Sequence, residues 1–460
     1  VLQFGSGNFL RGFVDWMIQE ANEKVSFNAG VSVIQSISSG AVLQQQEGVY
    51  TLALKGIQQE EFVSRRYRID VIQRIVNAAS EFQAFLDEGT NPDLQLIVSN
   101  TTEAGIVFSE TDQPFSVPAS TFPGKLTQLL FHRYQQQIEG GLIVLPTELI
   151  EQNGTILRNC VHQYAKHWSL PSEFLSWINT NVTFCNTLVD RIVSGFPNRP
   201  AESVYAELGY KDELLVEGEW FHQWVIEGPR WIEEVLPFKK AGCNVIYTND
   251  LAPFRTRKVR ILNGAHTCMA CVGLLAGIPT VREAIEHPVV GRYLKRLIYD
   301  DIAVYIAGDL TELEKYAEEV INRYRNPSID HQLKSISLNS FSKFAVRVLP
   351  TLHAQVDKNG FVSDRLILAL ASLLYLYRGT IQESSGIKDN ADVLKWMKEW
   401  WSADTTVQNP EALCRLVLSK SEWWGADLTQ IPNLVSRCAA DLKKIHEKGI
   451  LDLLKEPSAD

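Results

Sequence analysis

The sequence is short of positive charge and of long apolar runs. Its 460 residues hold 44 Lys and Arg against 54 Asp and Glu, which gives a formal net charge of −10. Proteins that bind the phosphate backbone of DNA or RNA usually carry a basic face, so we expect no nucleic-acid partner. No apolar run reaches the roughly 18–20 residues that cross a bilayer, and no secretory signal pattern opens the chain. These absences predict a cytoplasmic protein that does not enter a membrane.

Cysteine is also scarce, and its distribution excludes a disulfide framework. The seven cysteines are scattered along the chain, whereas disulfide-stabilised folds are short and rich in cysteine. Only Cys268 and Cys271 form a C-x-x-C pair, and no second Cys or His pair stands at the spacing of a zinc site. We therefore expect two buried thiols rather than a metal or redox site, and an activity that needs no metal.

The first part of the chain alternates buried strands with helices. A helical pattern with apolar residues on one face follows the first strand. The predicted strands are the apolar runs 1–4, 31–34, 94–98 and 142–145. This alternation predicts a doubly wound α/β fold, in which ligands bind beyond the carboxyl ends of the strands.

The pattern changes from about Ser172 onward, where we expect few strands and many amphipathic helices. Turn-forming residues and a proline interrupt the periodicity at 248–253. The sequence therefore predicts an α/β protein of two domains, a Rossmann-like domain over residues 1–250 and a mostly helical domain over 251–460. The predicted helices of the second part include 281–297, interrupted at Pro288, and 310–324, 366–377 and 434–446.

A glycine pair follows the first predicted strand. Gly5 and Gly7 stand where the strand turns into a helix, which would let the backbone approach a pyrophosphate at the helix N-terminus. Leu10 occupies the place of the third glycine of G-x-G-x-x-G, and a simple strand-to-helix turn explains the pair equally well. Gln35 and the two residues after it stand where an acidic ribose ligand is usual, so spacing leaves the choice between NAD and NADP open.

A second cluster brings a lysine, a carboxamide and an imidazole within nine residues. If the segment is an α-helix, Asn263 and His266 lie roughly 140° and 80° around the axis from Lys258, so the three side chains can line one side of a cleft. The positive charges of Arg257 and Arg260 favour a lysine that exchanges protons near neutral pH. The alternative is an ordinary helix with a solvated lysine and an Asn-Gly turn.

Several segments together resemble the mannitol dehydrogenase family of long-chain polyol dehydrogenases, over essentially the whole chain. Residues 146–150 and 326–333 are more similar to its uronate branch than to its mannitol branch. The segments that carry the resemblance occur in the family's order and are 4–11, 99–105, 188–193, 258–266 and 323–327.

This resemblance implies roles for particular residues. Lys258 would be the general acid and base, Asn263 would donate a hydrogen bond to the reacting oxygen, and His266 would bind and orient the substrate. Asp190 would hold substrate hydroxyls or position Lys258, with a structural salt bridge to Arg191 as the alternative. The residues expected to contact the implied cofactor, NAD, are Gly5, Ser6, Gly7, Asn8, Phe9, Leu10, Arg11, Ser99, Asn100, Thr101 and Thr102.

The sequence also departs from the mannitol branch. That branch has an asparagine where this chain has Leu149, so a two-asparagine site is not carried over. A uronate substrate needs a cation for its carboxylate. We prefer Lys343 for this role and keep Arg325 as a second substrate-binding candidate, with Arg323 and His331 also considered.

The resemblance implies an enzyme that interconverts D-tagaturonate and D-altronate in hexuronate catabolism. The alternatives are the same chemistry on fructuronate or on a neutral polyol such as mannitol, and a non-catalytic nucleotide-binding sensor. The expected partner is a small sugar acid, and we expect a monomer or a weak homo-oligomer.

Overall fold

The structure is a computed structural model, and it describes residues 1–35, 41–102, 104–115, 117–381, 386–402 and 409–455. The chain divides into two compact units, Val1–Leu251 and Ala252–Asp460. Each unit has its own architecture. The first holds the described strands, and the second is built from helices.

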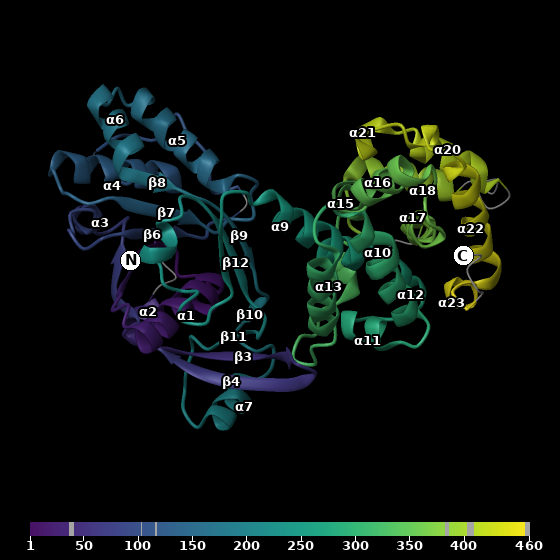
Figure 1. Cartoon of the computed structure of the whole chain (residues 1–460), viewed down its shortest axis with the longest axis horizontal. Helices are drawn as coiled ribbons and strands as arrows, with labels where there is room; N and C mark the ends of the chain where they lie inside the picture. Colours follow the sequence, from purple (N-terminus) through teal and green to yellow (C-terminus); the bar gives the residue numbers. More distant parts are fainter. Residues whose placement is uncertain (36–40, 103, 116, 382–385, 403–408, 456–460) are drawn as a thin grey trace. The chain divides into compact units, whose positions relative to one another are not determined.

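A six-stranded sheet forms the centre of the first unit (Figure 1). Its strand order is β5-β2-β1-β6-β7-β8, and all neighbouring strands run parallel. This order is that of a Rossmann fold, with the reversal of direction beside β1. The strands are β1 Leu2–Phe4, β2 Val31–Gln35, β5 Ile72–Asn77, β6 Leu96–Ser99, β7 Leu142–Pro146 and β8 Val182–Phe184.

Helices cover both faces of this sheet, because successive strand residues point to opposite sides. On one face Val31, Val33 and Val98 pack with α1 Asn8–Val25. On the other face Ile34, Ile97 and Val144 pack with four helices. Those helices are α3 Phe82–Glu88, α4 Phe122–Gln135, α5 Asn153–His167 and α6 Ser172–Asn181.

The first unit contains strands that the sequence pattern did not predict. The expectation of few strands beyond Ser172 was wrong, because six short strands lie between residues 182 and 248. Runs of three to five residues are too short to show a clear period, and β4 is an exposed, charged edge strand. The unpredicted strands are β3 Tyr50–Gln58, β4 Glu61–Ile69, β5, β8, β9 Asn186–Asp190, β10 Val193–Gly195, β11 Val216–Glu219, β12 Gln223–Glu227 and β13 Val245–Thr248.

Most of these strands form two smaller sheets, β10-β11-β3-β4 and β13-β12-β9. α1 packs against the first of them as well as against the parallel sheet, and a Cβ on Gly12 would come within 2.9 Å of Val193 Cγ1. α1 is therefore enclosed, which explains why even Asp15 on this helix is fully buried. Short helices complete the unit: α2 Ala41–Gln45, α7 Ala201–Leu208 and α8 Ile232–Val235.

The second unit is a bundle around α10 Ala265–Leu275. α10 is apolar on all sides and packs against α17 Asp364–Leu376, α14 Leu333–Ile336 and α15 Ser340–Arg347. The helices that the sequence predicted are present, with the interruption at Pro288 separating two of them. The predicted helices correspond to α11 Val281–Glu286 and α12 Val290–Arg296, α13 Leu310–Tyr324, α17, and α22 Leu434–Lys448. The α-helices not yet named are α9 Ala252–Arg257, α16 Leu349–Asn359, α18 Ala391–Ser402, α20 Pro410–Leu418, α21 Ser421–Trp424 and α23 Ile450–Leu453.

The C-x-x-C pair lies in the core of the second unit. Cys268 and Cys271 are fully buried on α10, and burial raises the pKa of both thiols, to about 12 for Cys271. The buried-thiol interpretation is confirmed. Among the described residues, no group of three His, Cys, Asp or Glu side chains suits a metal ion, and no helix combines the length and apolar character needed to cross a bilayer.

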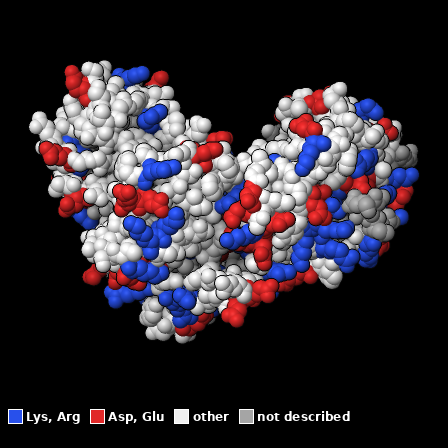
Figure 2. Space-filling model, viewed as in Figure 1, with Lys and Arg blue, Asp and Glu red and all other residues white. Residues whose placement is uncertain are grey.

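The surface carries both signs of charge. On the face drawn in Figure 2, blue and red side chains are interspersed rather than gathered by sign. The arginines of β4 are partnered: Arg66 pairs with Glu207, Arg68 pairs with Asp70, and the Arg65 guanidinium lies 5.3 Å from the Trp220 ring centre. Each arginine of this exposed strand thus has a carboxylate or an aromatic ring as a neighbour.

Candidate active site

The glycine loop after β1 has the geometry of a phosphate cradle. Gly5 has a φ of +115°, a conformation that side chains disfavour. Gly7 is the N-cap of α1, and a Cβ built on it meets nothing within 4 Å. The loop therefore leaves open space at the N-terminus of an 18-residue helix, where the exposed N–H groups favour an anion.

The missing third glycine has a structural reason. Leu10 is fully buried, and its Cδ1 would lie 3.6 Å from a Cβ on Gly5, so this side chain supports the turn from below. A different glycine of α1, Gly12, allows a close approach to β10 and β11 of the four-stranded sheet, where a Cβ would come within 2.9 Å of Val193.

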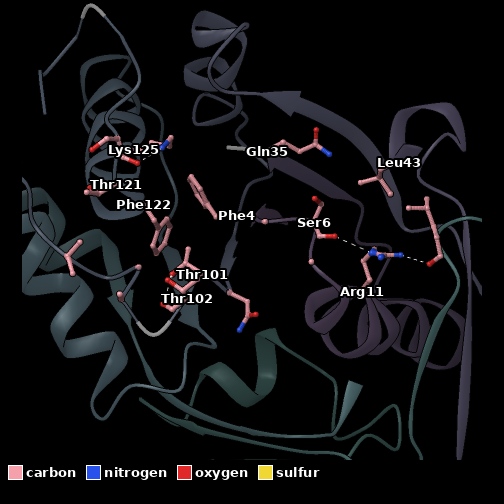
Figure 3. Close-up of a pocket in the computed structure, with 18 residues that line it drawn as sticks. Phe4, Ser6, Arg11, Gln35, Leu43, Thr101, Thr102, Thr121, Phe122 and Lys125 are labelled. Atoms are coloured by element: carbon pink, nitrogen blue, oxygen red, sulfur yellow. Dashed lines mark hydrogen bonds between the residues drawn. The ribbon is translucent and has the colours of Figure 1, made fainter. Parts of the chain in front are cut away.

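A cleft of about 700 Å³ opens at this loop (Figure 3). It lies where β1 and β6 end, the point at which the strand order reverses. Ligands of open α/β sheets bind at this point. The predicted cofactor residues that line the cleft are Gly5, Ser6, Gly7, Arg11, Asn100, Thr101 and Thr102.

Four predicted cofactor residues do not line the cleft. Leu10 is in the core, and the ring of Phe9 stacks on Phe13 with centres 5.0 Å apart. Asn8 accepts a hydrogen bond from Arg11 and packs against Gly195. Ser99 is 1% exposed and donates to Glu148 Oε2 at 3.1 Å. Motif position alone could not separate residues that face the cleft from residues that support it.

Arg11 lines the cleft while its guanidinium fixes the loop. It donates to the carbonyl oxygens of Ser6 and Leu214 (Figure 3). It also donates to Asn8 Oδ1 at 2.7 Å. Burial lowers the pKa of Arg11, and the charges of Tyr50 and Asp15 oppose that effect. The guanidinium thus places one positive charge beside the cleft while holding the glycine loop to the segment before β11.

The loop after β6 is held by a carboxylate that sequence reasoning gave no role. Glu148 is 3% exposed, and its Oε1 accepts from Thr101 N at 2.8 Å and from Thr101 Oγ1 at 2.9 Å. Asn100 Nδ2 donates to Thr147 Oγ1 at 3.0 Å. A Thr-Glu pair directly after a buried strand is the signal that would have pointed to this wall of the cleft. The neighbouring Leu149 is 63% exposed and offers no polar group.

Lys258 and Asn263 lie on a π-helical turn, Lys258–Gly264, rather than on the α-helix assumed from the sequence. Hydrogen bonds in a π-helix join residues five apart, and such turns are frequent at functional sites. The angle from one residue to the next is smaller around a π-helix than around an α-helix. The 140° separation between Lys258 and Asn263 expected for an α-helix was therefore wrong, and on this turn the angle between the two residues is smaller.

Packing fixes this turn. Gly264 lies against the end of α15, where a Cβ would come within 2.9 Å of the Arg347 carbonyl oxygen. Tyr324 on α13 donates to the Leu262 carbonyl oxygen at 2.7 Å. Arg260 donates to Thr351 Oγ1 at 2.9 Å, and Arg257 lies over the rings of Phe254 and Tyr316.

His266 follows the turn on α10 and is 8% exposed. Its ring centre lies 4.4 Å from that of Tyr324 and 5.3 Å from that of His331. Lys343 on α15 donates to the Ile336 carbonyl oxygen at 2.8 Å. Burial and, next, the charge of Lys343 lower the pKa of His331. Lys343 thus belongs to the same neighbourhood as His331, beside His266.

The remaining predicted residues lie elsewhere. Arg325 is the C-cap residue of α13. Burial raises the pKa of Tyr299, and the positive charge of Arg325 partly opposes that rise. Asp190 ends β9 and is buried. Arg191 donates to the carbonyl oxygens of Gly12, Trp220 and Phe221, and its guanidinium carbon lies 4.3 Å from the Trp16 ring centre.

Two family models account for both units. The mannitol dehydrogenase Rossmann domain matches residues 1–240, and the mannitol dehydrogenase C-terminal domain matches residues 250–446. The chain belongs to the mannitol dehydrogenase family. It is an oxidoreductase that acts on a CH–OH group, as the family and its curated relatives establish.

Curated relatives of this mannitol dehydrogenase family member match it over its whole length. The altronate oxidoreductase of Bacillus subtilis (strain 168) is 44% identical over 99% of this chain and 94% of its own. That of Bacteroides thetaiotaomicron is 39% identical over 99% of this chain and 96% of its own.

Solved structures of the family share the fold. A substrate-free D-sorbitol dehydrogenase matches with a TM-score of 0.81 at 23% identity, over 98% of this chain and 94% of its own. Mannitol 2-dehydrogenase of Pseudomonas fluorescens, in a ternary complex with NAD and D-mannitol, matches with a TM-score of 0.70 at 22% identity, over 99% of this chain and 93% of its own.

Proposed function

We propose that this protein interconverts D-tagaturonate and D-altronate with NAD as the hydride carrier, in hexuronate catabolism. The observation that supports the chemistry is the π-helical turn that holds both Lys258 and Asn263, directly before His266 on α10. The substrate is supported by the full-length similarity to altronate oxidoreductases.

The cleft of the first unit fits a dinucleotide. Gly7 leaves open space before α1, Arg11 contributes a positive charge, and Thr101 and Thr102 form the wall at the end of β6. When bound, the dinucleotide would supply a hydride acceptor for the oxidation of altronate at its carbinol carbon and a hydride donor for the reduction of tagaturonate at its ketone carbon. Glu148 holds the Thr101 loop in place for this ligand.

The second unit supplies the proton chemistry. In the oxidation, Lys258 removes the proton from the substrate hydroxyl, and in the reduction it returns a proton to the same oxygen. Asn263 donates a hydrogen bond to that oxygen and stabilises the charge that develops on it. His266 is held by the rings of Tyr324 and His331 and orients the sugar.

Lys343 is the cation that we assign to the substrate carboxylate. It lies near enough to His331 for its charge to add to the effect of burial in lowering the pKa of that imidazole. Arg325 instead is the C-cap residue of α13, and its charge partly opposes the rise that burial causes in the pKa of Tyr299. Burial and the charge of Arg347 lower the pKa of Lys343, so a bound carboxylate would relieve the repulsion between two neighbouring cations. Asp190 stays a candidate for contact with substrate hydroxyls. A cytoplasmic location and a monomeric or weakly oligomeric state stay predictions.

A substrate comparison tests the proposal. NADH oxidation is measured with D-tagaturonate, D-fructuronate and D-fructose under identical conditions. We expect the highest kcat/KM with D-tagaturonate. Preference for D-fructuronate or D-fructose would overturn the substrate assignment, and NADH binding without turnover of any of them would favour a sensor.

A further inference from the structure

Gln35 is the last residue of β2 and lines the cleft beside the glycine loop (Figure 3). It is 4% exposed, and its Nε2 is buried without a hydrogen-bond partner among the residues that the structure describes. A buried amide N–H without a partner costs free energy, so such groups in folded proteins usually serve a ligand or water. The donor lies at the place where Rossmann folds bind the adenosine ribose.

Gln35 has a neutral amide where NAD-binding Rossmann folds usually have a carboxylate. In NAD-binding Rossmann folds an acidic residue near this place accepts hydrogen bonds from ribose hydroxyls. Glutamine has the same length as glutamate and offers one acceptor and two donors, but it carries no charge. It can therefore bind a ribose hydroxyl, yet it does not repel a phosphate group on that hydroxyl.

The described lining of the cleft carries positive charge and no negative charge. Its charged lining residues, within the described part of the chain, are the cations Arg11 and Lys125, and no Asp or Glu is among them. Lys125 lies near the start of α4, is 7% exposed and donates to the Ser120 carbonyl oxygen at 3.1 Å. The cleft thus has no described negative charge with which to exclude a 2′-phosphate.

We propose that Gln35 binds the adenosine ribose hydroxyls of the dinucleotide, and that its neutral amide makes discrimination against NADP weaker than a carboxylate at this place would. Gln35 is a specificity-determining residue in this view. The inference rests on the proposed function, because it needs a dinucleotide in the cleft.

Calorimetric titration with NADH and with NADPH tests it without any substrate. Gln35→Ala is expected to weaken NADH binding about three- to tenfold, the usual effect of losing a hydrogen bond. Gln35→Glu is expected to keep NADH binding within about threefold and to raise the NADPH-to-NADH ratio of Kd values at least about tenfold. Gln45→Glu, the same substitution at an exposed residue of α2, is the control and should move the ratio less than about twofold.

The outcomes separate the two proposals. If the wild type binds neither NADH nor NADPH, the proposed function fails. If the wild type binds NADH but Gln35→Glu leaves the ratio at the wild-type value, the inference about Gln35 is wrong and the proposed function stands. Equal melting temperatures of the variants and the wild type show that a change in Kd does not arise from unfolding.

Discussion

The two units build their candidate functional clusters by different means. The cleft of the first unit is shaped by backbone: the positive φ of Gly5, the bare N-terminus of α1, and a loop whose amide donates to Glu148. The cluster of the second unit is shaped by side chains on a helix of altered pitch, packed against Tyr324 and His331. Backbone sites follow from local motifs, whereas side-chain sites depend on contacts distant in sequence.

The largest expected effect is on the chemistry of the second unit. Lys258→Ala should lower kcat by roughly 10²- to 10⁴-fold, the usual contribution of a general acid or base. NADH affinity should stay within about twofold, because the variant leaves the first unit untouched. Steady-state kinetics and fluorescence titration measure the two quantities. A kcat within tenfold of the wild type would remove Lys258 from the mechanism.

The next effect concerns the buried core of the first unit. Burial raises the pKa of Asp15 from 3.8 to about 7, although Tyr50 donates a hydrogen bond to its carboxyl group. In the second unit, by contrast, the buried Asp301 pairs with Arg365. Because the folded state binds the Asp15 proton more tightly, its stabilising contribution is complete below pH 4 and is lost as the pH rises towards 7.

The variant Asp15→Asn removes this titration. Relative to the wild type, its free energy of unfolding should rise by about 2–3 kcal/mol between pH 5 and pH 7.5. Urea denaturation at the two pH values measures this difference. A constant difference between the variant and the wild type would show that Asp15 does not titrate as described.

A pair of glycine variants sharpens the contrast between the units. Gly264→Ala places a methyl group 2.9 Å from a backbone oxygen that cannot rotate away, so we expect a loss of about 1–3 kcal/mol in stability. Thermal unfolding monitored by circular dichroism measures it. An unchanged melting temperature would mean that the space between the turn and α15 can accommodate a methyl group.

Gly7→Ala is expected to weaken NADH binding and to leave the stability of the fold unchanged, in contrast to Gly264→Ala. No atom lies within 4 Å of the added Cβ and φ is −67°, so the melting temperature should not change. The methyl group would occupy the space before α1, and NADH binding should weaken about tenfold. Tight NADH binding by this variant would place the pyrophosphate away from the loop.

The sequence predicted four of the six strands of the Rossmann sheet, the helical second unit and the glycine loop at which the cleft opens, because each depends on local periodicity or on glycine. It did not predict the π-helical turn, since residues 258–264 are equally compatible with an α-helix. The contact of Gly264 with the Arg347 carbonyl oxygen is tertiary. The sequence also missed Glu148 as the carboxylate that holds the Thr101 loop. It placed Gln35 where a ribose ligand is usual, but it could not show that the amide Nε2 is buried without a partner among the described residues.

The central claim is that a hydride passes between the nicotinamide and the keto carbon of the sugar acid. D-Tagaturonate is reduced with NADH deuterated at the 4R or the 4S position, and the D-altronate is examined by mass spectrometry and NMR. The account predicts one deuterium, on the former carbonyl carbon, from one of the two cofactors. Product without deuterium from either cofactor, or no D-altronate, would contradict it.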